Sequence, residues 1–418
     1  MITRKAFRYR IYPTPEQEAR LFAWENALRW LWNLAQEQRL MCLSRVSYRR
    51  IYLTAFDQIN ELKALRAENP WLADVPRNVC AQLLVELDKA WQRCFKRLAL
   101  APRWKRKGRD QVTICEPHPK VWHLGTDGLV FPKLGTLCTV FHRPIEGIPK
   151  TCSIVRDGDQ WFISISCVVE IPAPVTPPGP PIAIDRGVVN LLVDSTGRVV
   201  ENPRWLKRQE KRIAHAQRVV SRRRKGSINQ AKAKRRVARL HRMVRRQRDH
   251  LLHCEARYYA KNHGTVIVEH LQVRNMSRSA RGTVDGPGKR VRQKAGLNRA
   301  ILDGGWGRFV SFLRYKTMWA GSTLMEVAPA YSSQTCARCG QVDASSRRSQ
   351  SEFVCVACGH HDHADVNAAL VLLGRGSHGL AACGGSAEVR RPMKQELRVV
   401  RRGPRRGSEP KAPSFRTG

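Results

Sequence analysis

Within the N-terminal segment Lys5–Tyr12, apolar and basic side chains alternate from Phe7 to Ile11. Phe7, Tyr9 and Ile11 fall on one face of an extended chain, and the arginines between them fall on the other. The pattern therefore predicts a β-strand with one packed face and one basic face. Pro13 ends this strand.

Residues 14–99 show the longer apolar spacing of helices. Thr14 precedes Pro15 and Gln17, which is the arrangement of an N-cap, a first-turn proline and a capping box. A second apolar stripe with intervals of three and four residues runs from Val79 to Leu98. We therefore expect a helical block inserted directly after the first strand.

From about residue 100 to residue 171 the pattern changes to short β segments joined by glycine-containing turns. This change predicts a small β-barrel or sandwich, and the isolated N-terminal strand is its natural partner. The Pro-rich residues 172–181 then predict a stiff linker and a domain boundary.

The second half of the chain mixes short apolar runs with basic helices. Three short strands are expected first, followed by basic helices broken near Gly226 and a buried strand. An irregular basic loop to about residue 300, a tryptophan-containing helix and a last strand come next. The Gly-, Pro- and Arg-rich residues 376–418 predict disorder. The expected elements occupy residues 182–185, 190–194, 198–200, 203–262, 265–268, 306–318 and 323–327.

Composition adds an electrostatic constraint. The 418 residues include 75 Lys and Arg against 34 Asp and Glu, which leaves a formal net charge of +41. Because 42% of the residues are hydrophobic, the chain can bury real cores and is not a disordered polycation. A charge of this size repels itself unless a polyanion neutralises it, so nucleic acid is the leading partner. No apolar run approaches a membrane span and no secretory signal is present, so we expect a cytoplasmic protein with no membrane partner.

The densest basic run lies within residues 203–262. Residues 201–250 alone contain 19 Lys and Arg. Such a run is typical either of a solvated helix face or of a hairpin that follows a phosphate backbone. Clusters such as Arg222–Lys225 favour the second interpretation.

Four of the 13 cysteines form two CxxC pairs, and the other nine are scattered singly. Two such hooks supply the four thiolates of a tetrahedral Zn²⁺ site. Since four sulfur ligands complete the coordination, the pattern predicts a structural zinc ribbon. The predicted ligands are Cys336, Cys339, Cys355 and Cys358. Three nearby histidines are expected at the surface or at a second site: His360, His361 and His363.

The order of three acidic residues along the chain indicates a shared site. Asp185 ends one predicted strand, Glu269 ends another, and Asp365 begins a helix. Taken singly, they fit a turn residue, a charged strand end and a plain N-cap. Together they follow the layout of an RNase H-like core, in which parallel central strands bring three carboxylates together. Clustered carboxylates bind Mg²⁺ or Mn²⁺, and two such ions can support phosphodiester hydrolysis.

The stretch from about Lys5 to Leu373 resembles TnpB, the family of RNA-guided nucleases of bacterial and archaeal insertion sequences, which is related to the compact type V CRISPR effectors. Five motifs carry the resemblance, and in combination they are specific. One departure is His270, where relatives often have Asp after the glutamate. The motifs are Ile184–Asn190, Val268–Met276, Lys294–Leu302, Pro329–Gly340 and Ala364–Ala369.

The resemblance implies a multidomain α+β protein. A wedge β-barrel would contain an inserted helical recognition domain, and an RNase H-like (RuvC) α/β nuclease domain would contain an inserted zinc ribbon. The implied boundaries are 1–13 and 100–171 for the wedge, 14–99 for the recognition domain, 172–181 for the linker, 182–330 and 363–375 for the RuvC domain, 331–362 for the zinc ribbon, and 376–418 for a disordered basic tail.

The resemblance also implies an activity. A guide RNA would pair with double-stranded target DNA, and the protein would recognise a short motif beside the target. Asp185, Glu269 and Asp365 would hold the Mg²⁺ or Mn²⁺ ions that cut the DNA. One protein per guide RNA is implied, in a prokaryotic cytoplasm at the nucleoid.

Three other classes fit part of the pattern. An RNA-guided DNA-binding protein without cleavage normally lacks one or more of the acids, and all three are present here. A strand-transferring transposase also uses an RNase H fold, but the position of the zinc ribbon between the second and third acids favours the TnpB arrangement. A general RNA-binding zinc protein explains the charge and the cysteines and leaves the acids unexplained.

Overall fold

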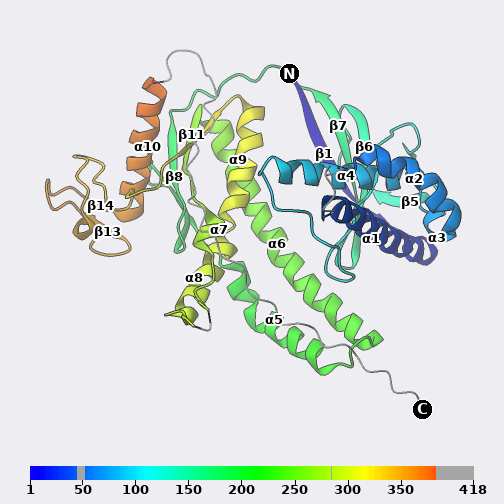
Figure 1. Ribbon diagram of the computed structural model, residues 1–418. Helices are drawn as coiled ribbons and strands as arrows, with labels where there is room; N and C mark the ends of the chain where they lie inside the picture. The colour runs from blue at the N-terminus through cyan, green and yellow to red at the C-terminus, as the bar shows by residue number, and fades with distance from the viewer. Residues whose placement is uncertain (45–51, 284, 383–418) are drawn as a thin grey trace. The chain divides into compact units, whose positions relative to one another are not determined.

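The computed structural model describes residues 1–44, 52–283 and 285–382 (Figure 1). The described part is mixed α+β, with two large sheets and a two-stranded ribbon. The first sheet has the strand order β2-β6-β7-β1-β5-β4-β3, and every neighbouring pair is antiparallel. Its strands are β1 (Ile2–Tyr12), β2 (Ile114–Glu116), β3 (His123–Leu124), β4 (Gly128–Phe131), β5 (Gly135–Val140), β6 (Ile148–Asp157) and β7 (Gln160–Glu170).

The predicted N-terminal strand is confirmed as β1. Phe7, Tyr9 and Ile11 are all buried. β1 pairs with β7 along most of its length and with β5 at its C-terminal end, so it joins the β block that follows the helices in sequence. On the opposite face, the guanidinium of Arg8 stacks over the Phe162 ring at 4.1 Å.

The first sheet is an open half-barrel, where the sequence predicted a small β-barrel or sandwich. Its edge strands, β2 and β3, pair only with β6 and β4, and no ladder joins them to each other in the described residues. The helical block provides the reason, because its side chains share one hydrophobic core with the strands and bury the sheet without closure. Its helices are α1 (Pro15–Ser44), α2 (Ala55–Glu68), α3 (Pro70–Ala73) and α4 (Arg77–Phe95).

The start of α1 follows the predicted capping box. The Thr14 backbone N–H donates to Gln17 Oε1 at 3.0 Å, and the Gln17 backbone N–H donates to Thr14 Oγ1 at 3.3 Å. Gln17 Nε2 also donates to the backbone oxygens of Leu134 and Thr136, both at 2.9 Å. The cap therefore also fastens the helix to the β4–β5 hairpin.

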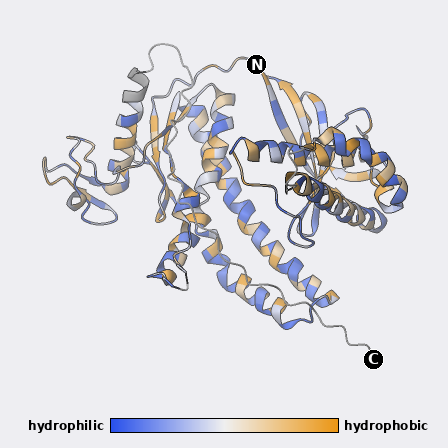
Figure 2. Cartoon of the chain, in the orientation of Figure 1, coloured by the Kyte–Doolittle hydropathy of each residue, from blue (hydrophilic) through white to orange (hydrophobic). Residues whose placement is uncertain are grey.

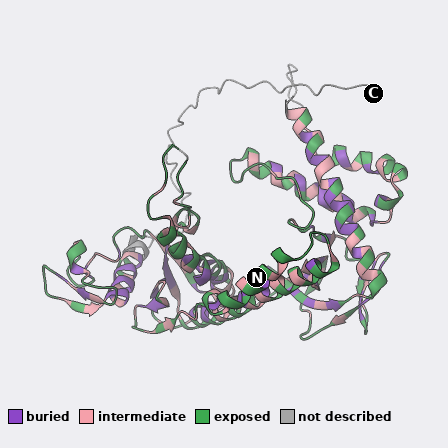
Figure 3. Cartoon of the chain, turned by 90° about the horizontal axis from the view of Figure 1, so that it is seen from below, coloured by how far each residue is buried: buried purple, intermediate pink, exposed green. Residues whose placement is uncertain are grey.

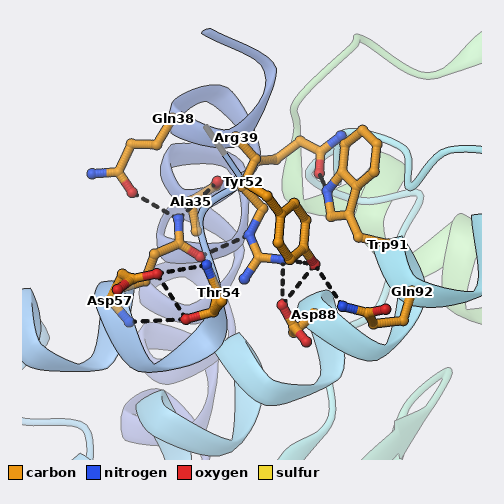
Figure 4. A network of polar contacts seen from close by, with 11 residues as sticks. Ala35, Gln38, Arg39, Tyr52, Thr54, Asp57, Asp88, Trp91 and Gln92 are labelled. Carbon is orange, nitrogen blue, oxygen red and sulfur yellow. Dashed lines mark hydrogen bonds and ion pairs between the residues drawn. The ribbon is translucent and has the colours of Figure 1, made fainter. Parts of the chain in front are cut away.

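A buried polar network ties α1, α2 and α4 together (Figure 4). Arg39 is 1% exposed, and it donates to Gln58 Oε1 and to Asp88 Oδ1, both at 2.9 Å. The Tyr52 hydroxyl donates to the same Asp88 oxygen at 2.9 Å. Since a buried charge is tolerated only when it is paired and hydrogen-bonded, this network restricts how the three helices can pack.

The second sheet has the strand order β10-β9-β8-β11-β12. β8, β11 and β12 run parallel, and β9 and β10 continue from β8 as an antiparallel meander. The expected sheet with parallel central strands is thereby confirmed. The strands are β8 (Ile182–Asp185), β9 (Asn190–Asp194), β10 (Val199–Glu201), β11 (Thr265–Glu269) and β12 (Thr323–Val327). The helices are α5 (Trp205–Arg222), α6 (Ile228–Asn262), α7 (Val273–Met276), α8 (Val291–Gly304), α9 (Trp306–Ala320) and α10 (Ala364–Ala382).

Alternation along the central strands separates the two faces of this sheet. Ile182 and Ile184 belong to a core that includes side chains of α6 and α9. Ala183 belongs to a second cluster with Ile267 of β11 and Leu372 of α10. α10 therefore covers one face and α6 with α9 covers the other (Figure 1). Figure 3 colours residues of these strands and helices as buried.

The basic run folds as two long helices, as expected. The break between α5 and α6 falls at residues 223–227, and Ser227 Oγ accepts from the Gln230 backbone N–H at 3.2 Å as an N-cap. Both helices are largely hydrophilic (Figure 2).

Part of this basic run is neutralised within the protein. Arg239, Arg242 and Arg245 of α6 each pair with Asp157 or Asp159 in the β6–β7 turn. The hypothesis of a phosphate-following hairpin therefore concerns the remaining cations of α5 and α6, for which it stays a prediction.

Two expectations about the second half are wrong. The predicted irregular loop to residue 300 contains α7 and the start of α8 at Val291. No side-chain cap signals α8 in the sequence, since Arg290 precedes it with a left-handed φ of +53°. α10 continues to Ala382, so the predicted tail is wrong at its start, and 383–418 lie outside the described residues. No helix in the described part is long and apolar enough to cross a bilayer.

Candidate active site and cysteine cluster

Strand periodicity places two of the predicted acids on the same face of the second sheet. Asp185 follows Ala183 by two residues on β8, and Glu269 follows Ile267 by two residues on β11. Since side chains two residues apart on a strand share a face, both carboxylates lie on the face that α10 covers. Asp365 is the second residue of α10. The fold therefore gathers all three acids at the carboxyl ends of parallel strands.

The three carboxylates are close enough to influence one another. Burial, together with the negative charges of Glu269 and Asp365, raises the pKa of Asp185 to about 7. The Arg186 backbone N–H donates to Asp185 Oδ1 at 2.9 Å and opposes this shift. Clustered carboxylate oxygens are the hard donors that Mg²⁺ and Mn²⁺ prefer. The chemistry of these residues thus fits a divalent cation.

The other two acids are held by side chains to which the sequence analysis assigned no role. Ser332 Oγ donates to Glu269 Oε1 at 2.6 Å. Arg347 Nη2 donates to Asp365 Oδ1 at 3.3 Å, and Asn190 Nδ2 donates to Asp365 Oδ2 at 3.4 Å. Asn190 lies within a motif that the sequence analysis identified, whereas nothing in the local sequence marks Arg347.

A buried guanidinium lies beside the acids. Arg186 is 5% exposed and donates to the backbone oxygen of Glu269, while its Nε has no hydrogen-bond partner among the described residues. Burial lowers the pKa of Arg186, and the charges of Glu269 and Asp185 counteract that shift. The cation therefore offsets part of the repulsion between the carboxylates.

The four predicted cysteines form one cluster, with all sulfur atoms within 4.8 Å of one another. The Cys336 and Cys358 sulfurs are 3.7 Å apart, and the Cys339 and Cys355 sulfurs are 3.6 Å apart. Sulfur atoms around a tetrahedral metal with bonds of ~2.3 Å are about 3.8 Å apart, so the spacing fits Zn²⁺. Within the described part of the chain, this is the only group of three or more Cys, His, Asp or Glu side chains that converges so closely, and the three acids do not form such a group.

Both cysteine pairs adopt the same backbone turn. Gly340 N donates to the Cys336 oxygen at 2.9 Å, and Gly359 N donates to the Cys355 oxygen at 3.0 Å. The two glycines have φ values of +76° and +69°, which glycine adopts without steric cost. In the second turn, the backbone N–H of Cys358 lowers the pKa of Cys355, whereas the neighbouring sulfurs raise the pKa of Cys339. The lowered pKa of Cys355 favours the thiolate that metal binding requires.

The histidines next to the second cysteine pair have other contacts. His361 Nε2 lies 3.5 Å from Glu352 Oε1, and His363 Nδ1 accepts from the Asp365 backbone N–H at 3.3 Å. Neither these two nor His360 belongs to the cysteine cluster of the described residues.

The cysteine segment is tied to the helix that carries the third acid. Asn367 of α10 is fully buried, accepts from the Ala337 backbone N–H at 2.9 Å, and donates to the Thr335 backbone oxygen at 2.8 Å. Because Asn367 follows Asp365 by two residues, these hydrogen bonds help to position the third carboxylate.

The fold and the site together describe an α+β protein in which two acids end parallel strands, a third acid begins a helix, and four cysteines form a separate cluster. Three family descriptions match parts of the chain. "Probable transposase" covers residues 164–280, "Cas12f1-like, TNB domain" covers 306–372, and "Helix-turn-helix domain" covers 1–40. The first two matches contain Asp185, Glu269, Asp365 and the four cysteines.

Curated relatives match nearly the whole chain. The "Putative RNA-guided DNA endonuclease InsQ" of Escherichia coli (strain K12) is 34% identical over 396 residues, which cover 94% of this chain and 97% of the relative. A "Putative RNA-guided DNA endonuclease" of Streptomyces pristinaespiralis is 32% identical over 405 residues, which cover 95% of this chain and 94% of the relative. The chain therefore belongs to the TnpB family of RNA-guided DNA endonucleases, as the sequence motifs predict.

A solved structure shares the fold at low sequence identity. The "Cryo-EM structure of the Cas12f1-sgRNA-target DNA complex" matches with a TM-score of 0.50 and 14% identity, over 89% of this chain and 99% of that one. At this identity the likeness concerns the fold alone.

Proposed function

We propose that this protein is an RNA-guided DNA endonuclease of a transposable element. It binds a guide RNA, recognises a short motif beside the target, and hydrolyses phosphodiester bonds of the target DNA. The observation that carries the proposal is the gathering of three mutually repelling carboxylates at the ends of parallel strands. The 34% identity to a relative named as a putative RNA-guided DNA endonuclease supports this activity over that of other enzymes acting on nucleic acids.

Asp185, Glu269 and Asp365 are proposed to hold Mg²⁺ or Mn²⁺. Two such ions, when bound, supply an activated water and stabilise the leaving 3′ oxygen. The protein's own groups hold the carboxylates in place, since Ser332 fixes Glu269 and Arg347 fixes Asp365.

The domain assignment implied by the resemblance is proposed for the observed elements. The half-barrel would be the wedge, α1–α4 the recognition domain, the second sheet with its helices the RuvC domain, and the cysteine segment a zinc ribbon. Support comes from the second sheet, whose order of antiparallel meander and parallel strands is that of an RNase H-like core.

The central test uses the ribonucleoprotein purified after co-expression with its flanking transposon DNA. Sequencing the RNA that co-purifies defines the guide. Incubation with a matching plasmid and Mg²⁺ should then give cut DNA. Absence of cutting with an intact guide would favour the cleavage-inactive binder, and joined donor and target DNA would favour a transposase.

Asp185→Ala should abolish cutting while guide and target binding persist, because the residue acts on the metal ions and not on the nucleic acid. Asp127→Ala, which removes an exposed carboxylate in the turn before β4, is the matched control. Cutting by the Asp185 variant would remove this residue from the proposed site.

Light scattering of the ribonucleoprotein tests the proposed ratio of one protein per guide RNA.

Structural Zn²⁺ is proposed at the four cysteines. Cys336→Ser should remove bound zinc and lower the unfolding temperature, because metal binding contributes folding free energy. Cys138→Ser changes an exposed cysteine of β5 outside the cluster and should leave both unchanged. Elemental analysis and thermal unfolding measure the two effects, and an unchanged zinc content in the Cys336 variant would count against the assignment.

A further inference from the structure

A large basic cavity lies outside the candidate active site. Its volume is about 670 Å³, and it is bounded by α1, the loop before β2, the β6–β7 turn and α6. Six cationic side chains line it, against one carboxylate, that of Asp110. The cations are Arg29, Lys105, Arg109, Arg156, Lys234 and Arg235.

Most of this positive charge has no protein counter-ion. Among the described residues, only Arg156 of the six cations forms an ion pair, with Glu25 at 3.2 Å. Asp110 Oδ2 accepts from the Arg106 backbone N–H at 2.9 Å, and the charge of this one carboxylate acts on both Lys105 and Arg109. Like charges gathered in a confined space repel one another unless an anion joins them. The cavity therefore has the electrostatics of an anion-binding site.

Arg29 gives the clearest sign of such a ligand. Its side chain lines the cavity, yet the residue is 8% exposed. Nη1 donates to Asn26 Oδ1 at 2.8 Å, whereas Nε is buried and has no hydrogen-bond partner in the described part. Leaving a buried charged donor unpaired is costly. An anion in the cavity would satisfy this donor.

Lys105 is held in position by α1. Asn33 binds its backbone twice, accepting from the Lys105 N–H at 2.8 Å and donating to the Lys105 oxygen at 3.0 Å. The ammonium group lies 4.3 Å from the centre of the Trp32 ring. Burial lowers the pKa of Lys105, and nearby arginines lower it further. The loop is thus fixed to present a partly desolvated cation to the cavity.

We propose that this cavity binds backbone phosphates of a nucleic acid. Arg and Lys donors match phosphate oxygens, and none of the described side chains that line the cavity is an aromatic ring on which a base could stack. The inference rests on the proposed function and locates one phosphate site of that nucleic acid. Its source is either guide RNA or DNA, which share the phosphodiester group.

The test compares the salt dependence of binding by full-length variants. Arg109→Gln with Lys234→Gln removes two exposed cations of the cavity, so folding should persist. For a short fluorescent single-stranded RNA, the slope of log affinity against log salt should fall by about 0.7 for each phosphate that the variant no longer neutralises. Lys63→Gln with Arg77→Gln removes two exposed cations outside the cavity and should keep the original slope. Equal slopes for both variants, with this RNA and with a short fluorescent duplex DNA, would overturn the proposal.

A footprint on the unmodified protein provides a second measurement. Acetylation of Lys105 and Lys234, read by mass spectrometry, should fall when nucleic acid is bound, whereas acetylation of Lys63 should not. Protection by RNA alone identifies the guide as the source, and protection by duplex DNA alone identifies the target. No protection by either overturns the proposal. Protection without plasmid cutting by the guided complex would retain this site and contradict the endonuclease function.

Discussion

At Asp185, burial and two neighbouring negative charges raise the pKa to about 7. In the unfolded chain an Asp has a pKa of ~3.9. Between these values the folded protein keeps a proton that the unfolded chain has already released. The free energy of unfolding of the metal-free protein should therefore fall as pH rises through this window, and the penalty is complete above about pH 7.

Asp185→Asn should consequently stabilise the protein in buffer without Mg²⁺ or Mn²⁺. The gain should be roughly 2 to 4 kcal/mol at about pH 8 and smaller at about pH 5. Thermal unfolding at both pH values measures it, with Asp127→Asn as the control for losing one negative charge. A gain of the same size at both pH values would contradict the assigned environment of Asp185. Added Mg²⁺ should stabilise the original protein and not the variant.

Arg347 contacts the carboxylate of Asp365 and lies outside all five sequence motifs. Its guanidinium lies 3.3 Å from Asp365 Oδ1, on one of the carboxylates that would hold the metal ions. Arg347→Gln should lower the cleavage rate about 10- to 100-fold with target binding retained. Arg348→Gln, at the exposed neighbouring position, should cut normally. Single-turnover cleavage and filter binding distinguish the two effects, and equal rates for both variants would leave Arg347 without a role.

The acids and the cysteines could be predicted because strand ends, helix starts and CxxC spacing are local patterns. Arg347 and Ser332 could not, because each meets its carboxylate only after the cysteine segment folds against α10 and the second sheet. Arg347 lies outside the five sequence motifs, and Ser332 lies within Pro329–Gly340, where the sequence assigned it no role.

At the level of elements, the approach of α10 to β11 is unusually close at Gly376. A Cβ there would overlap the buried side chain of Ile267, with Cγ1 only 2.8 Å away. Glycine is therefore needed at this position for packing. Gly374, two residues earlier on the same helix, has nothing within 4 Å of a Cβ.

Gly376→Ala should push α10 away from the sheet and lower stability by ~1–3 kcal/mol, the range for overpacking a core. Because Asp365 is on this helix, cleavage should also slow. Gly374→Ala should instead raise stability by roughly 0.5–1 kcal/mol, since alanine favours the helix. Thermal unfolding of both variants measures the contrast, and equal effects would refute the close packing.

Elements with a clear apolar period were predicted well, and those fixed by long-range packing were not. β1, α1 and the parallel strands follow their patterns. α8 was missed because Val291–Leu302 mixes basic and small residues and lacks a cap. The choice between a barrel and a sandwich was left open, because local strand patterns do not show that helices bury an open sheet.

For the whole molecule, the formal charge of +41 overstates the positive charge that is free to bind a polyanion. Arginines of α6 are already paired with the β6–β7 turn, and Arg186 is committed to the acids. The remaining cations still repel one another, so the free protein should be less stable than its complex with nucleic acid.

Single-stranded RNA should therefore raise the unfolding temperature of the free protein. The increase should shrink between about 50 and 200 mM salt, as counter-ion release requires. A peptide nucleic acid of the same sequence has no phosphates and should have no such effect. A salt-independent increase would point away from electrostatic binding.

The two-stranded ribbon, β13 (Glu352–Val354) and β14 (His361–His363), leads into α10 without a connecting residue. Each helical residue turns the chain by about 100°. One inserted residue at this junction would rotate Asp365 off the sheet face, even with all four cysteines intact. The number of residues between Cys358 and Asp365, which is six, thus determines the direction in which Asp365 points. Their number is a sequence criterion by which an intact nuclease site can be told from a decayed copy.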